Sequence, residues 1–357
     1  MQIRTFQTYR VFIPYNPPVH PYRSRRGQTQ RAASLIVRLE TNSGLVGWGE
    51  GGGHLPIEVA DLVIGQDPTQ IEWFLQALAD AGVAPYPRSA IEMACWDLIG
   101  QAAGYALCDL LGGRLRSEVE LCACIGIREP TASAEAALMC LSQWGFTTLK
   151  TKAGREVEED LAIARAIREA IGDRATLRPD ANEGYSPADA ERVLRGMAEI
   201  GGLQYFEDPC SGHEVEALAR FRQTIAVPIA VNMAIFEGAS VVPIAQAGAA
   251  DVLMPDTASA GGIWPVKKVA AVAEAFGLPC VMHCSHDLGL KTAAVAHIVA
   301  STPNFILASD TTYHSLVADI LATPFSIRNG RIPVPTGPGL GVQVDEEQLR
   351  KYQAAAA

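Results

Sequence analysis

The segment ATLRPDANEGYSPADAERVLRGMAEIGGLQYFED, residues 175–208, decides the fold of this 357-residue chain. It contains two short apolar runs, and each run ends in an acidic residue. Between the runs, apolar residues recur at the intervals of a helix, and the helical stretch ends at Gly201. This order predicts a strand, a helix and a second strand, the repeating unit of parallel α/β proteins.

The same unit recurs from about residue 118 to residue 312. Comparable helical stretches occupy 157–172 and 266–277, and both end in glycine. The polar residues that close the strands from Lys152 to Asp310 are spaced 24 to 28 residues apart. Eight apolar runs fit the pattern: VELCACIG (119–126), FTTLK (146–150), ATLRPD (175–180), LQYFED (203–208), PIAVN (228–232), DVLMPD (251–256), PCVMH (279–283) and FILASD (305–310). We therefore predict an α/β fold, a (β/α)8 TIM-type barrel in which a helical stretch follows every strand.

An open doubly wound sheet is the main alternative to the barrel. Such a sheet does not readily place a polar residue at nearly every strand end. In dinucleotide-binding sheets a GxGxxG motif follows the first strand, and this sequence has no such motif there. Both observations favour the barrel.

The segments on either side of the barrel have a different pattern. Residues 4–13 and 33–50 are typical of antiparallel strands, with an Asn-Ser-Gly turn at 42–44, and a helical stretch occupies 90–104. The tail at 328–349 is rich in turns and is expected to return to the cap. In chain order, we predict an α+β capping domain at 1–115, the barrel at 116–322 and a C-terminal segment at 323–357 that completes the cap.

Composition excludes several classes of protein. The formal charge of −10 argues against a nucleic-acid partner, which requires a basic face. The N-terminal residues 1–15 lack the apolar stretch of a signal peptide, and no run is long enough for a membrane span. The eight cysteines form no CxxC pair, so free buried thiols in a cytoplasmic protein are expected. A homo-oligomer is expected only because such assembly is common among soluble enzymes.

Oxygen-bearing side chains close three consecutive strands of the predicted barrel. These are Asp180, Glu207 and Asn232. In barrel enzymes the catalytic groups lie at the carboxyl ends of the strands, and two carboxylates with one amide oxygen suit Mg²⁺. Each acidic residue taken alone is more often the cap of the following helix. Three such donors on adjacent strands favour a magnesium site.

Two lysines and a histidine are further candidates for chemistry. Lys150 and Lys152 alternate along one strand, so both face the same side and are expected to lower each other's pKa, although solvated lysines are commoner. His283 ends the seventh strand, and Asp256 ends the sixth. A carboxylate beside one ring nitrogen would fix the tautomer of the imidazole. A satisfied core histidine is the alternative, and a role for His286 or Asp287 in binding substrate is left open.

The ordered set of motifs resembles the enolase superfamily, in its mandelate racemase and muconate lactonizing branch. The motifs are WGE (48–50), WDLIG (96–100), LKTK (149–152), Asp180-Ala-Asn182, Asp256 before Gly261-Gly262, His283 and GPGLG (337–341). Within that branch, Glu207-Asp-Pro-Cys210, Asn232-Met233 and Ser309-Asp310-Thr311 look most like glucarate dehydratases. The sequence departs from that subgroup after His283, where it reads Cys284-Ser285-His286, and in a shorter cap.

The resemblance implies a role for each matched residue. Asp180, Glu207 and Asn232 would bind Mg²⁺. Lys152 would be one acid/base group and His283, paired with Asp256, the other. Lys150 would assist the substrate carboxylate, and Asn182 and Asp310 would be polar contacts of the substrate. Enzymes of this superfamily combine a lysine or histidine base with magnesium, which stabilises the dianion formed when a proton α to a carboxylate is removed.

The leading hypothesis is dehydration of an acid sugar to a 2-keto-3-deoxy acid. Lys152 or His283 takes the α-proton, depending on the stereochemistry, and the β-hydroxyl leaves with a proton from His283. A racemase or epimerase is the first alternative, and a non-catalytic barrel that binds an anion is the second. The loop at 20–30 holds His20, Tyr22 and Arg25, which are expected to contact a polar or anionic end of the substrate, although a solvated basic loop is an equal alternative.

Overall fold

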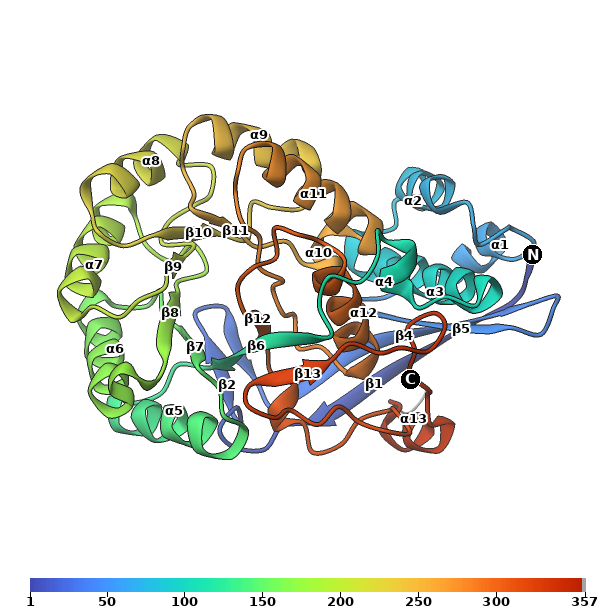
Figure 1. Ribbon diagram of the computed structural model, residues 1–357, viewed down its shortest axis with the longest axis horizontal. Helices are drawn as coiled ribbons and strands as arrows, with labels where there is room; N and C mark the ends of the chain where they lie inside the picture. Colours follow the sequence, from blue (N-terminus) through green and yellow to red (C-terminus); the bar gives the residue numbers. More distant parts are fainter. Residues whose placement is uncertain (355–357) are drawn as a thin grey trace.

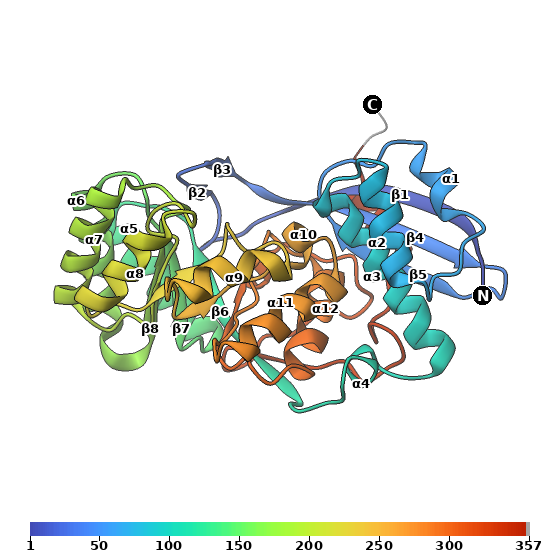
Figure 2. The same cartoon turned by 90° about the horizontal axis from the view of Figure 1, so that it is seen from above.

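The computed structural model describes residues 1–354 and divides into two lobes (Figure 1). One lobe is a ring of helices around parallel strands, and the other is an antiparallel sheet covered by helices. Seen from above, a thin hairpin extends from the sheet of the second lobe toward the first (Figure 2). Among the described residues, no helix combines the length and the apolar character that a membrane crossing requires.

The first lobe is a parallel β/α barrel. Its strands lie in the order β11, β10, β9, β8, β7, β6, β12. The bounds of the strands are β6 (Glu118–Ile125), β7 (Thr148–Lys152), β8 (Thr176–Asp180), β9 (Phe206–Glu207), β10 (Ile229–Val231), β11 (Val252–Leu253) and β12 (Ser309–Thr311). The helices outside them are α5 (Pro130–Trp144), α6 (Val157–Ile171), α7 (Pro187–Ile200), α8 (Val215–Thr224), α9 (Gly238–Gln246), α10 (Thr257–Ala260), α11 (Ile263–Ala275) and α12 (Gly289–Ala300), with a 3₁₀ turn η1 (Gly172–Arg174) after α6. The barrel fold predicted from the sequence is confirmed.

Residues 280–283 occupy the position of the seventh strand. They do not form a regular strand, but their backbone hydrogen bonds close the ring. The backbone N–H groups of Val281 and His283 donate to the carbonyls of Leu253 and Pro255 on one side. On the other side, the N–H of Asp310 donates to the carbonyl of Met282. Segment 280–283 therefore joins β11 to β12 and brings His283 to the carboxyl end of the barrel.

The prediction that a helical stretch follows every strand is wrong for the last strand. After β12 come a short 3₁₀ turn, η2 (Tyr313–Ser315), and an irregular tail with β13 (Arg331–Pro333) and α13 (Glu346–Tyr352). Prolines and glycines interrupt residues 324–341 too often for a long helix. β13 instead pairs antiparallel with β6, and α13 packs against the cap. The tail thus contacts both lobes, and the three-part division of the chain remains a prediction.

Two layers fill the interior of the barrel. Tyr205, Ala230, Val252, Met254 and Val281 form an apolar cluster there. Side chains on a strand alternate between its two faces, so the residues two positions further along point into the same interior. By this rule, Glu207, Asn232, Asp256 and His283 lie in the layer above the apolar cluster, toward the carboxyl end. The guanidinium of the buried Arg178 stacks on the ring of Tyr205 at the same level, so the floor beneath the polar groups is only partly apolar.

The second lobe is an antiparallel sheet with helices on one face. The sheet has the order β1 (Ile3–Pro14), β4 (Arg31–Thr41), β5 (Val46–Gly51), and β4 joins β5 through the predicted turn, in which Gly44 has a φ of +82°. The helices are α1 (Val59–Val63), α2 (Ile71–Asp80), α3 (Pro85–Ala103) and α4 (Leu107–Leu110). The hairpin β2 (Tyr22–Ser24) and β3 (Gly27–Thr29) leaves this sheet between β1 and β4. The predicted α+β cap is confirmed.

Alternate glycines let β5 lie directly on α3. A Cβ atom at Gly49 would stand 2.0 Å from the carbonyl oxygen of Ala90 and 2.6 Å from the nitrogen of Ala94. Gly47 and Gly51 face the same helix with similar clearance. The glycine of the WGE motif is therefore required by close packing of two backbones.

Replacement of Gly49 by alanine is expected to destabilise the protein by about 3 kcal/mol or more, because a strand must move away from a helix. Gly52→Ala is the matched control, since its nearest atoms belong to the side chain of Tyr86, which can turn aside. The check is thermal unfolding of both variants. Equal midpoints for Gly49→Ala and wild type would show that the strand and helix separate without cost.

Candidate active site

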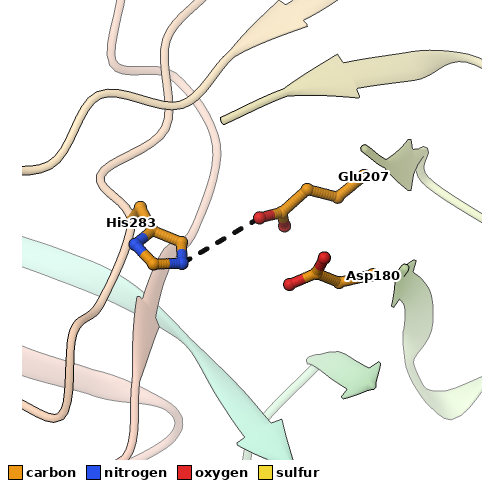
Figure 3. Close-up of side chains that lie close together, drawn as sticks. All are labelled: Asp180, Glu207 and His283. Atoms are coloured by element: carbon orange, nitrogen blue, oxygen red, sulfur yellow. Dashed lines mark ion pairs between the residues drawn. The ribbon is translucent and has the colours of Figure 1, made fainter. Parts of the chain in front are cut away.

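Two buried carboxylates form the centre of the site. Asp180 ends β8 and Glu207 ends β9, and the two residues are register partners in the parallel sheet. Both side chains are fully buried. In Figure 3 they lie side by side at the strand ends and face His283. This places two hard oxygen donors next to each other, as the strand spacing predicted.

Lys150 lies beneath the carboxylate pair and binds three acidic side chains. Its Nζ is 3.0 Å from Asp180, 2.6 Å from Glu207 and 2.8 Å from Asp310. Burial opposes its charge, but the attraction of the three carboxylates outweighs burial and raises the pKa of Lys150 well above its usual value. The expectation that the two lysines lower each other's pKa is wrong for Lys150, because acids surround it on other strands.

Lys152 lies one step nearer the mouth and forms an ion pair with Asp180. Its side chain is 7% exposed, whereas that of Lys150 is 1% exposed. Although burial raises the pKa of Asp180, the two ammonium groups lower it overall. Of the two lysines, only Lys152 is open toward the mouth of the barrel.

His283 lies on the other side of the carboxylate pair. Its Nε2 is 4.0 Å from Oε1 of Glu207, the contact drawn in Figure 3. Its Nδ1 is 2.9 Å from Oδ2 of Asp256, so the contact predicted between these two residues is present. Burial alone would raise the pKa of Asp256, but Lys291 and His283 lower it, so the group is an ionised acceptor. Nδ1 of His283 therefore donates its proton to Asp256, and Nε2 faces the site.

The residues at this centre fit a divalent cation. Asp180, Glu207 and His283 each offer an atom, and these atoms lie within 4.8 Å of one another. Oε2 of the buried Glu207 pairs with Lys150, whereas Oε1 accepts no hydrogen bond within residues 1–354. Burial, followed by the charge of Asp180, raises the pKa of Glu207 well above its usual value. A cation held by the two carboxylates would satisfy this free oxygen and offset the repulsion.

Asn232, the third predicted ligand, stands just above the pair. Ala230 is the register partner of Glu207, and Asn232 follows two residues later on the same face of β10. Its amide nitrogen donates to the carbonyl of Met254 at 2.7 Å, and its backbone N–H donates to Asp208. Because the nitrogen is engaged, the amide oxygen is the atom left for a ligand. A role for Asn232 in metal binding remains a prediction.

The predicted substrate contacts fall into two groups. Asn182 and Asp310 belong to the barrel and touch the central cluster, through Asp180 and Lys150 respectively. Tyr22 and Arg25 come from the hairpin. Tyr22 lies near Cys124 and Lys150, and its burial raises its pKa. The guanidinium of Arg25 donates to the carbonyl of Asn182 at 3.5 Å. The loop therefore does reach the barrel mouth.

The hairpin is attached to the barrel mainly through its backbone. The carbonyl of Arg23 accepts a hydrogen bond from the N–H of Ile127, and the carbonyl of His20 accepts one from the guanidinium of Arg128 at 2.9 Å. Arg128 also donates to the carbonyl of Pro18. The imidazole of His20 has a buried Nδ1 without a partner in the described residues, and no contact places it on the central cluster.

Two groups near the site were not assigned a role from the sequence. Lys291, in α12, binds Asp256. His286 contacts Tyr15 at 2.8 Å and packs against the ring of Tyr22, and burial, followed by the nearby charge of Lys152, lowers its pKa to about 4. An uncharged His286 thus lies under the cap. The only signal in the sequence was its position three residues after His283.

The fold and the site together define a barrel enzyme in which a lysine and a histidine flank paired carboxylates. Sequence profiles support this class: the Enolase C-terminal domain-like family matches residues 132–348, and the Mandelate racemase / muconate lactonizing enzyme N-terminal domain matches residues 8–112. The chain belongs to the mandelate racemase and muconate lactonizing enzyme family of the enolase superfamily. The resemblance seen in the sequence is confirmed at this level.

Known relatives carry out several reactions. D-galactarolactone cycloisomerase of Agrobacterium fabrum is 31% identical, over 93% of this chain and 94% of that protein. A putative sugar isomerase of Streptomyces coelicolor has the same fold, with 34% identity, a TM-score of 0.89 and coverage of 99% and 96% of the two chains. The dipeptide epimerase of Enterococcus faecalis, solved with Mg and the dipeptide L-Leu-L-Tyr, has 28% identity, a TM-score of 0.88 and coverage of 96% and 100%.

The glucarate dehydratase subgroup is not singled out by these comparisons. A probable glucarate dehydratase of Streptomyces coelicolor is 32% identical, over 73% of this chain and 64% of that protein. This identity is similar to that of the cycloisomerase. The subgroup therefore remains a prediction.

Proposed function

We propose that this protein removes the proton α to the carboxylate of an acid sugar in a Mg²⁺-dependent reaction. One observation carries the proposal: the buried pair of Asp180 and Glu207 lies between the ammonium of Lys152 and the imidazole of His283. Two groups that can exchange protons thus flank the place where a substrate carboxylate would bind. The sugar character is supported by the polar surroundings and by the names of two relatives, a D-galactarolactone cycloisomerase and a probable glucarate dehydratase.

Asp180 and Glu207, with Asn232 as a third donor, would hold the metal. The bound ion supplies positive charge that stabilises the negative charge developing on the substrate carboxylate. Lys150, held by three acidic side chains, contributes a fixed positive charge from below. Asp180, Glu207 and Lys150 are almost fully buried, and burial strengthens these interactions.

We infer dehydration as the overall reaction. Lys152 or His283 takes the α-proton, and the electron pair of the broken C–H bond forms a double bond as the β-hydroxyl leaves. His283 supplies a proton to that hydroxyl, which departs as water. The resulting enol takes up a proton at the β-carbon and becomes a 2-keto-3-deoxy acid. Asn182 and Asp310 would contact the hydroxyl groups of the substrate.

A racemase or epimerase is the second candidate. The placement of Lys152 and His283 on opposite sides of the carboxylate pair suits removal of the proton from one face and its return to the other. Relatives named as a hydrophobic dipeptide epimerase and an L-Ala-D/L-Glu epimerase support this alternative.

A substrate screen in deuterated water tests both reactions. The panel contains D-gluconate, D-galactonate, D-glucarate, galactarate, the corresponding lactones and L-Ala-L-Glu, each with Mg²⁺. We expect 2-keto acid formation from at least one acid sugar, detected with semicarbazide. Deuterium at the α-carbon with inversion and no keto acid would assign the isomerase reaction instead. If the protein binds these acids and leaves both the carbon–hydrogen and carbon–oxygen bonds intact, it is a binding protein and the proposal fails.

The expected cytoplasmic location and homo-oligomeric state remain predictions. A small-molecule carboxylate is the substrate class that this proposal names.

A further inference from the structure

A buried lysine lies behind the pair of Asp256 and His283. Lys291 belongs to the first turn of α12 and is 2% exposed. Its Nζ lies 2.7 Å from Oδ1 of Asp256 and 2.7 Å from Oδ1 of Asp287. A positive charge at a helix N-terminus meets the positive end of the helix dipole, and its burial adds a desolvation cost. Asp256 and Asp287 outweigh this cost and raise the pKa of Lys291 above its usual value, so the ammonium is charged and held at a fixed position.

Lys291 completes a full set of contacts around Asp256. Oδ1 accepts from Nζ of Lys291 and from the backbone N–H of Ala258, at 2.7 Å each. Oδ2 faces Nδ1 of His283 at 2.9 Å and accepts from the hydroxyl of Ser285 at 2.6 Å. With Oδ1 held, the carboxylate cannot rotate, and Oδ2 stays directed at the imidazole.

The backbone of Lys291 is itself fixed by the cap. Glu50, in the WGE motif of β5, accepts the N–H of Leu288 at 2.7 Å and the N–H of Lys291 at 2.9 Å. Asp287 also accepts the backbone N–H of Ser285, which ties the loop after His283 to the same ammonium. The amine therefore projects from a fixed point and bridges the loops that follow the sixth and seventh strands.

We propose that Lys291 is a positioning residue for His283 and acts through Asp256. Its ammonium holds Asp256 so that Nδ1 of His283 keeps its proton and Nε2 stays directed into the site as the atom that takes up and releases protons. The inference deepens the proposed function, in which His283 transfers a proton. It assigns a Lys–Asp–His relay in which only the imidazole touches the substrate.

A charge-balanced variant separates this role from a purely structural one. Lys291→Met alone leaves two buried carboxylates without a cation, and the protein then risks misfolding. The double variant K291M/D287N removes one charge of each sign, so the combined charge of residues 256, 287 and 291 stays at −1. D287N alone is the matched control, because it keeps the bond between Lys291 and Asp256.

The experiment is NMR of the ¹⁵N-labelled imidazoles in the full chain, without substrate. The chain has seven histidines, and H283N assigns the signals of His283. For wild type and D287N we expect a single tautomer with the proton on Nδ1. For K291M/D287N we expect that pattern to be lost while the midpoint of thermal unfolding stays near that of D287N.

The result that overturns the inference is an unchanged Nδ1–H pattern for His283 in the folded double variant. A purely structural role would lower the unfolding midpoint and leave the tautomer as it was. Because the measurement needs no substrate, its outcome does not depend on whether the acid-sugar screen succeeds.

Discussion

Lys152→Met is expected to lower turnover of the acid substrate by about 10³-fold or more, because a general base in such a reaction contributes about 10²–10⁴-fold. The substitution keeps the length of the side chain and removes the amine that pairs with Asp180. Lys152 and His283 flank the carboxylate pair from opposite sides, so each is expected to serve one face of the substrate. Lys152→Met should therefore abolish α-deuteration from its own face and leave exchange from the face of His283.

The complementary variant His283→Asn should give the opposite pattern. Lys351→Met is the matched control, because this lysine lies exposed on α13 and is remote from the barrel mouth. The measurement is α-deuteration of both epimers of the active substrate, followed by proton NMR. Retention of more than a tenth of wild-type turnover by Lys152→Met would exclude this lysine as the base.

Glu207→Gln is expected to abolish the response of the protein to Mg²⁺. Both oxygens of Glu207 are buried, and Oε1 accepts no hydrogen bond among the described residues. Replacing the carboxylate by a neutral amide removes the negative charge and leaves only one oxygen that could bind a cation. For the wild-type protein, Mg²⁺ at one hundred times its Kd should add about 2.7 kcal/mol to the free energy of unfolding, because the metal binds the folded chain. The variant should gain almost none of this stabilisation and should show no turnover.

Thermal unfolding and calorimetric titration with Mg²⁺ provide the measurement, and neither requires a substrate. Glu216→Gln on the exposed face of α8 is the control for loss of one acidic charge. A chelator should bring the wild-type midpoint down to its metal-free value. If Mg²⁺ raises the midpoint of Glu207→Gln as much as that of wild type, the cation binds elsewhere and the assigned centre is wrong.

The sequence predicted the central residues because a parallel barrel gathers the carboxyl ends of its strands. Asp180, Glu207 and His283 each follow an apolar run, and this placement alone was enough to bring them together. The regular spacing also predicted the contact between Asp256 and His283. Such residues can be recognised because the apolar run before each of them shows that it stands at the end of a strand.

Other features depend on contacts between distant segments and could not be predicted in this way. The raised pKa of Lys150 results from acids on three other strands, of which Asp310 is 160 residues away. Lys291 occupies a helix, where a lysine is ordinarily solvated, and only the tertiary structure turns it toward Asp256. The absence of a helix after β12 has a local cause, because prolines and glycines interrupt that part of the sequence. The pairing of β13 with β6 joins distant segments and has no local signal.

The main-chain attachment of the β2–β3 hairpin bears on how substrate preference can change. The hydrogen bonds that hold it use the carbonyls of residues 18, 20 and 23, which every amino acid supplies. The side chains of Arg23, Arg25 and Arg26 can therefore be exchanged without loss of these bonds. Selection for a new substrate can act on this hairpin while the proton-transfer groups below it stay unaltered, so one barrel chemistry can be redirected to different acids by a few substitutions in a short ribbon.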